Sequence, residues 1–99
     1  MSLHFKWDRN KADTNLQKHH VDFKEACTVF SNPLARIFDD EMHSLEEQRE
    51  IIIGHSITGR LLVIAFTERS ENAVRIISAR KATKRERNSY EEKIDIENW

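Results

Sequence analysis

Basic side chains crowd one short stretch of this 99-residue chain, where an apolar run turns directly into a charged one. Residues 74–80 (VRIISAR) alternate and are rich in β-branched types, which predicts a strand. In residues 81–90 (KATKRERNSY), Thr83 lies three positions before Glu86, a spacing typical of a capping box at the start of a helix. The cations that meet at this junction are Arg80, Lys81, Lys84, Arg85 and Arg87. The planar fork of arginine suits phosphate, so the junction favours a phosphate-bearing partner. The alternative is a solvated helix face on which Glu86, Glu91 and Glu92 pair with the arginines.

The side chains available beside this junction are those that RNA cleavage without a metal ion would need. Such cleavage requires a base for the ribose 2′-hydroxyl proton, cations that stabilise the charge growing on the phosphoryl oxygens, and an acid for the leaving 5′-oxygen. The candidates for charge stabilisation are Arg60, Arg69, Arg75 and Arg80. The candidates for proton transfer are His19, Glu68 and Tyr90. Taken singly, each of these three is more often a residue that makes a structural hydrogen bond.

Metal and cofactor chemistry has little support in the residue pattern. The five histidines (His4, His19, His20, His43 and His55) do not follow a Cys/His or HExxH spacing. The chain also has no P-loop and no Rossmann glycine pattern. Its single cysteine, Cys27, lies among apolar neighbours and is expected to be a buried, reduced thiol. We therefore expect no metal and no cofactor.

Charge is balanced overall but segregated along the chain. There are 16 Lys+Arg residues against 17 Asp+Glu, with acidic residues concentrated in residues 39–50 and 91–97, on either side of the basic block. Segregated charge creates local potentials that the net value hides.

No stretch is long enough for a membrane span, and the N-terminus has no secretory signal pattern, so we expect a cytoplasmic protein that does not engage membranes.

Two helices are predicted in the N-terminal third of the chain, where they position the candidate residues of that region. Residues 4–7 form a short strand, and Asp8 caps a helix over residues 9–19. Lys11, Asn15 and Lys18 share one face of that helix, which judged alone is more often a solvated surface than a functional one. His20 is expected to adopt the left-handed backbone that ends the helix. A capping box of Asp22 and Glu25 starts a second helix that Asn32-Pro33 ends, giving an αα hairpin.

The second half of the chain is predicted to form a sheet. Residues 34–38 are an edge strand, residues 39–50 carry an acidic loop, and residues 50–55, 61–67 and 74–80 form an antiparallel meander. Residues 61–67 are apolar on both faces, so the hairpin should cover one side and the C-terminal helix or a partner the other. Arg75 and Arg80, five residues apart, are expected on opposite strand faces. The predicted fold is one α+β domain over residues 1–99, with a flexible tail at 91–99.

The order of these motifs resembles a known family. The segments are FKWD, KH-x-VDF-x-EA-x-x-VF, REIIIG, GRLLV, TER and RIISARKAT-x-x-ER with a later tyrosine, and together they resemble the BrnT family of bacterial ribonuclease toxins. The resemblance implies a RelE-like fold and endoribonuclease activity. It also implies neutralisation by a cognate BrnA-type antitoxin, through which the complex binds operator DNA. The matched polar positions are Lys11, Asn15, Lys18, His19, Arg60, Glu68, Arg69, Arg75, Arg80 and Tyr90. The chain departs from the family at His20, where glycine is usual, and at residues 70–72, where a Gly-Asp turn is usual.

The sequence is compatible with two functions. The first is an endoribonuclease with RNA as its substrate. Its catalytic candidates are Arg80, Arg75, Arg60, Glu68, His19 and Tyr90, and its RNA-binding candidates are Lys11, Asn15, Lys18, Arg69, Lys81, Lys84, Arg85 and Arg87. The second is a non-catalytic module whose basic groove binds an acidic segment of a partner protein.

Overall fold

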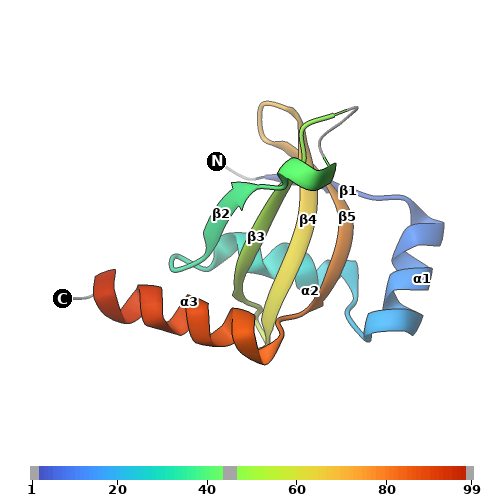
Figure 1. Ribbon diagram of the computed structural model, residues 1–99. Coiled ribbons are helices and arrows are strands. Elements are labelled where there is room, and N and C mark those ends of the chain that lie inside the picture. Colours follow the sequence, from blue (N-terminus) through green and yellow to red (C-terminus); the bar gives the residue numbers. More distant parts are fainter. Residues whose placement is uncertain (1–2, 44–46, 98–99) are drawn as a thin grey trace.

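A five-stranded sheet with helices on both faces makes up the protein (Figure 1). The computed structural model describes residues 3–43 and 47–97. Its elements are β1 (His4–Lys6), α1 (Arg9–His19), α2 (Phe23–Thr28), η1 (Val29–Ser31), β2 (Arg36–Asp39), η2 (Glu41–His43), β3 (Glu50–His55), β4 (Leu61–Ser70), β5 (Ala73–Lys81) and α3 (Lys84–Glu97). The strand order is β1-β5-β4-β3-β2, with β1 parallel to β5 and the other pairs antiparallel. This arrangement confirms the predicted α+β class, the meander and the C-terminal helix.

The predicted helix signals match the structure closely. The Asp8 carboxylate accepts the Lys11 N–H at 3.0 Å, and His20 ends α1 in the left-handed region with φ of 59°. Asp22 caps α2 by accepting the Lys24 N–H at 2.9 Å, but the predicted capping box with Glu25 is not formed, because the Glu25 carboxylate accepts from Arg60, Ser56 and Thr58 instead. α3 continues to Glu97, so most of the segment predicted as a tail is helical. Part of the predicted acidic loop, residues 44–46, lies outside the described residues.

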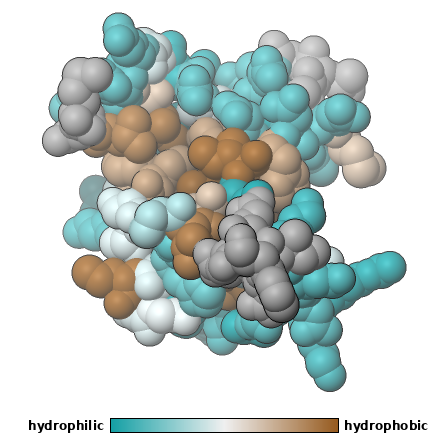
Figure 2. All heavy atoms as spheres, turned by 90° about the vertical axis from the view of Figure 1, so that its left-hand side faces the viewer, coloured by the Kyte–Doolittle hydropathy of each residue, from teal (hydrophilic) through white to brown (hydrophobic). Residues whose placement is uncertain are grey.

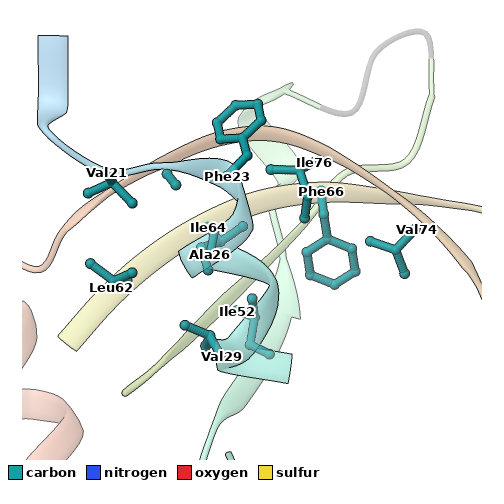
Figure 3. Close-up of a cluster of buried hydrophobic side chains, with 11 residues drawn as sticks. Val21, Phe23, Ala26, Val29, Ile52, Leu62, Ile64, Phe66, Val74 and Ile76 are labelled. Carbon is teal, nitrogen blue, oxygen red and sulfur yellow. The ribbon is translucent and has the colours of Figure 1, made fainter. Parts of the chain in front are cut away.

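The main core lies between the sheet and α2. Side chains on one face of α2 and the following turn meet alternate residues of the central strands (Figure 3). The residues of this cluster drawn with labels are Val21, Phe23, Ala26, Val29, Ile52, Leu62, Ile64, Phe66, Val74 and Ile76. On the opposite face, Leu61 and Val63 pack with Ile53 and with Tyr90 of α3. The prediction that β4 is covered on both sides is therefore confirmed.

A β-bulge in β5 overturns one prediction about the arginines. Arg75 is paired with Thr67 of β4, and Arg80 is paired with Val63. Those partners are four positions apart on β4, so they share a face, because side chains alternate along a strand. The register skips Ile77, which resets the alternation within β5. Arg75 and Arg80 therefore lie on the same face of the sheet, and the expectation of opposite faces is wrong.

Candidate nucleic-acid interface

The topology gathers many of the candidate cations at one end of the sheet. β4 begins where β5 ends, since Leu62 pairs with Lys81 and the Ala82 N–H donates to the Leu61 carbonyl at 2.9 Å. The last turn of α1 and the first turn of α3 both reach this end of the sheet (Figure 1). We call the resulting group the basic end, and its members are Lys18, His19, Arg60, Arg80, Lys81, Lys84 and Arg85.

A groove between α1 and β5 extends from the basic end along the sheet edge. Its volume is about 340 Å³, and its lining includes Lys11, Lys18, His19 and Ser78. Lys11 and Lys18 are exposed, whereas His19 is half-buried. Within residues 3–43 and 47–97, neither lysine side chain makes an ion pair or hydrogen bond, so both ammonium groups are available to a ligand.

Asn15 fixes α1 against the edge of β5. Its side-chain amide donates to the carbonyls of Ala79 at 2.8 Å and Val21 at 3.0 Å, and its oxygen accepts the Ala79 N–H at 3.1 Å. β1 pairs with residues 73–75 only, so Asn15 takes the place of a neighbouring strand further along β5. The residue is 7% exposed, and its side-chain amide already makes these hydrogen bonds. Asn15 thus positions the groove, and the prediction that it binds RNA has no support from this geometry.

Two parallel hydrogen bonds hold the forked guanidinium of Arg80 against the Glu86 carboxylate. Its Nη1 donates to Oε1 of Glu86 at 2.7 Å, and its Nη2 donates to Oε2 at 2.9 Å. Glu86 also accepts the Thr83 N–H at 2.8 Å while its own N–H donates to the Thr83 hydroxyl at 3.1 Å, which confirms the capping box. The hydrogen bonds from Arg80 lower the pKa of Glu86 to about 2. The Arg80 side chain remains 41% exposed, so its fork is oriented in advance and is accessible.

Arg60 belongs to the basic end but is committed to a different carboxylate. Its Nε donates to Glu25 at 2.9 Å, its Nη2 pairs with the other Glu25 oxygen, and its Nη1 donates to the His20 carbonyl at 3.1 Å. Glu25 also accepts from the hydroxyls of Ser56 and Thr58, each at 2.7 Å. The guanidinium hydrogen bond lowers the pKa of Glu25 to about 2. This network ties the β3–β4 hairpin to both N-terminal helices.

Three of the predicted residues lie toward the opposite end of β4 and β5. Arg75 is separated from Arg80 by four pairing steps, which at about 3.3 Å a step places their Cα atoms roughly 13 Å apart. Arg69 pairs with Glu47 at 3.0 Å. Glu68 follows Thr67 on the strand, so it points to the face opposite Arg75. The structure does not bring these residues together with the basic end.

Tyr90 lies in the core beneath α3. The side chain is 3% exposed, its hydroxyl donates to the Leu34 carbonyl at 2.9 Å, and its ring meets His55 edge-on at 5.7 Å. Burial raises the pKa of this phenol. Its observed contacts are those of a structural residue. Its predicted role in proton transfer stays a prediction.

The remaining junction cations differ in their pairing. Arg87 lies 3.7 Å from the Glu91 carboxylate, an i, i+4 pair on the exposed side of α3. Lys81, Lys84 and Arg85 are exposed and make no side-chain ion pair or hydrogen bond in the described part of the chain. With Lys11 and Lys18, they form a set of cations with no counter-charge of their own.

Two residues near this surface were not predicted as part of a site. Ser78 is exposed and lines the α1–β5 groove because the bulge shifts it there, and a bulge leaves no clear signal in a single sequence. Glu86 was predicted as a helix cap and, in the alternative of a solvated helix face, as a partner of the arginines, and the pair with Arg80 six residues earlier agrees with that alternative. Among the described residues, no group of three or more His, Cys, Asp or Glu side chains could hold a metal ion. No helix within residues 3–43 and 47–97 combines the length and hydropathy needed to cross a membrane.

Comparison with known proteins identifies a family and a similar solved structure. The family model described as "Ribonuclease toxin, BrnT, of type II toxin-antitoxin system" matches residues 7–86. Among solved structures, the chain is similar to the crystal structure of the Brucella abortus ribonuclease toxin BrnT, with 25% sequence identity and a TM-score of 0.66. That match covers 84% of this chain and 100% of the other. No curated protein matches the chain.

Proposed function

The chain belongs to the BrnT family of ribonuclease toxins of type II toxin–antitoxin systems, and on this premise we propose that it is an endoribonuclease that cleaves RNA at the basic end without a metal ion. The observation that carries the proposal is that the end of α1, the end of β5 and the start of α3 lie at one end of the sheet (Figure 1), and these segments carry Lys18, Lys81 and Lys84. Unpaired cations held close together repel one another, and a polyanion relieves that repulsion. The phosphate backbone of RNA is such a ligand.

The residues divide into binding and chemical roles. Lys18, Lys81 and Lys84 hold backbone phosphates on either side of the scissile bond. Arg80 presents its fork to the phosphoryl group and releases Glu86 as it does so, because carboxylate and phosphate offer the same bidentate geometry. His19 is the proton-transfer candidate nearest this surface, since it lines the same groove as Lys18.

The charges at the basic end support the proposed metal independence. A divalent cation would approach a surface where lysines and arginines predominate, and Coulomb repulsion disfavours that approach. A guanidinium stabilises developing phosphoryl charge directly, the role that a metal ion fills elsewhere. Arg80 therefore supplies the charge stabilisation in this proposal.

A cognate antitoxin of the BrnA type is the proposed protein partner. Family membership implies an antitoxin, and the resemblance in the sequence favours the BrnA type with operator DNA bound only through the complex. Co-expression with the neighbouring open reading frame should restore the growth of cells that this chain alone arrests. Equal growth with and without that frame would contradict a toxin role.

Charge reversal at the basic end tests where RNA is cleaved. Lys18→Glu and Lys84→Glu each place an anion where the proposal puts a backbone phosphate, so each should reduce the cleavage rate at least tenfold. Lys24→Glu is the matched control, because Lys24 is exposed on α2 and causes the same change in net charge. A similar loss in all three variants would mean that only net charge matters. Unchanged cleavage in the first two would place the site elsewhere.

A non-catalytic module is the second candidate, and the Arg80–Glu86 pair favours it, since the fork already holds a carboxylate. RNA cleavage by the wild-type protein separates the two candidates. A module that only binds acidic protein segments would give wild-type protein with no RNA cleavage at all.

A further inference from the structure

The free edge of the sheet at β2 carries apolar side chains that nothing in the described structure covers. β2 is the last strand in the sheet order and pairs with β3 alone among the described strands. Leu34, Ile37 and Phe38 are 48%, 56% and 50% exposed. Figure 2 shows hydrophobic side chains gathered across this side of the molecule. An edge strand with apolar side chains is a template for pairing with another chain, because alternate N–H and C=O groups point outward.

A groove beside this edge has an apolar floor and a basic rim. It lies between the sheet and α3 and has a volume of about 340 Å³. Ile53, Val63 and Tyr90 contribute apolar surface, and Phe38 continues that surface onto β2. The cations at the rim are Arg36, Arg85 and Lys93. Glu86 also lines the groove, but its carboxylate is held by Arg80.

We propose that β2 and this groove form a docking surface for an extended acidic segment of a partner protein. The segment pairs with the outer edge of β2 as an additional strand, which uses the outward backbone groups. An apolar side chain of the segment fills the groove over Val63 and Tyr90. Its carboxylates contact Arg85 and Lys93. These charge contacts determine the orientation of the segment along β2, which the backbone hydrogen bonds alone do not determine.

Charge and shape favour this occupant over a second copy of the chain. A two-fold interface through β2 would bring the rim cations of one copy toward the same cations of the other. Like charges brought together in this way oppose association. RNA would engage the rim cations but would leave the strand edge and the exposed Leu34 and Ile37 unused.

This surface is separate from the groove between α1 and β5, and it does not depend on ribonuclease activity. The β2–α3 groove adjoins the basic end at Arg85, which belongs to both, and at Glu86, which lines the groove and also holds Arg80. A partner segment on β2 therefore lies beside the proposed cleavage site, although the test below measures binding alone.

Peptide titration monitored by NMR amide shifts tests the proposal. The probe is a nine-residue peptide of alternating glutamate and valine, and the comparison peptide replaces each glutamate with lysine. The glutamate peptide should shift the amides of residues 36–39 and 85–93. Arg85→Glu and Phe38→Ala should each weaken its binding at least fivefold, and both side chains are exposed enough for the fold to be retained. Lys24→Glu, the matched charge control on α2, should bind as the wild type does.

Each contrary outcome overturns the proposal. Absence of binding, or shifts in residues 11–19 in place of residues 36–39, removes β2 as a docking site. Equal binding of the lysine peptide removes the acidic specificity. Shifts at β2 that depend on protein concentration without peptide indicate a second copy of this chain. If a 2′-deoxy-substituted RNA shifts the β2 amides more strongly than the peptide does, the surface binds nucleic acid.

Discussion

Arg80 and Glu86 hold each other in the two-bond geometry that a guanidinium also makes with phosphate. The pair orients the arginine before any ligand arrives, so no side-chain ordering is needed at the moment of binding. A partly exposed pair of this kind contributes little to stability, about 1 kcal/mol or less. The residue is therefore well suited to a functional role and poorly suited to a structural one.

Replacing Arg80 with alanine should leave the protein folded and reduce RNA cleavage by about a hundredfold or more, because a preorganised donor to developing oxyanion charge is lost. Arg80→Lys should recover only part of the activity, since lysine supplies charge without the fork. Circular dichroism and a single-turnover cleavage assay on the same samples check both statements. Unfolding of Arg80→Ala would show that the pair is structural, and full activity in a folded variant would remove Arg80 from the site.

Individual residues were the hardest part to predict from the sequence. Arg60, Arg75, Glu68 and Tyr90 have side chains suited to chemistry, yet Arg60 braces a hairpin and Tyr90 fills the core. Whether a polar side chain meets a carboxylate, a carbonyl or solvent depends on long-range packing, for example of Glu25 against Arg60, 35 residues later. Residue type and spacing do not contain that information.

At the scale of elements, the Glu25 network joins the β3–β4 hairpin to α2. The carboxylate accepts from Arg60, Ser56 and Thr58, and its pKa falls from 4.5 to about 2. A depressed carboxylate pKa stabilises the fold above the unfolded-state pKa, and that contribution is lost as the pH falls toward the folded-state value. Glu86, with its pKa also near 2, contributes in the same direction.

Glu25→Gln should lower the free energy of unfolding at pH 7 by roughly 1 to 3 kcal/mol, the range for hydrogen bonds to charged groups. The loss should shrink as the pH falls from about 5 to about 2, because the wild type loses its advantage over that window. Urea unfolding at several pH values measures this difference. A constant difference at every pH would mean that packing of the side chain, not its charge, stabilises the hairpin.

Asn15 joins α1 to the outer edge of β5, and its substitution tests whether the groove depends on that contact. Asn15→Ala leaves the Ala79 N–H and carbonyl without their side-chain partner at a buried edge, which should cost about 1 to 3 kcal/mol. RNA cleavage by the fraction that remains folded should also fall, since Lys18 and His19 lose their fixed position beside β5. Asn10→Ala, an exposed position that lines the same groove, is the matched control. Equal stability in the two variants would contradict the positioning role.

Elements were predicted better than residues because their signals are local. Asp8, His20 and the Thr83–Glu86 box mark helix ends by contacts within a few residues of the chain, and all three were found where predicted. The bulge at Ile77 was missed because it depends on the register between two strands. That single inserted residue places Arg80 on the same face as Arg75. A prediction from strand alternation alone therefore put the two arginines on opposite faces.

For the whole molecule, the arrangement of charge matters more than its sum. The formal net charge is −1, yet the ends of α1 and β5 and the start of α3 bring unpaired cations to one end of the sheet. The sequence does not reveal this cluster, because its members lie far apart along the chain: Lys18 and Lys84 are 66 positions apart. The antiparallel meander and the Asn15 contact are what bring them together.

Cleavage of a labelled RNA by the purified protein in excess chelator is the decisive test of metal-independent cleavage. We expect cleavage at the same rate with and without the chelator, internal cuts that leave 2′,3′-cyclic phosphate ends, and no cuts when the 2′-hydroxyl at the cleavage site is removed. The Arg80→Ala variant under the same conditions should be at least a hundredfold slower. Loss of cleavage on chelation with recovery on adding a divalent metal, or unchanged cleavage of the 2′-deoxy substrate, would contradict the account.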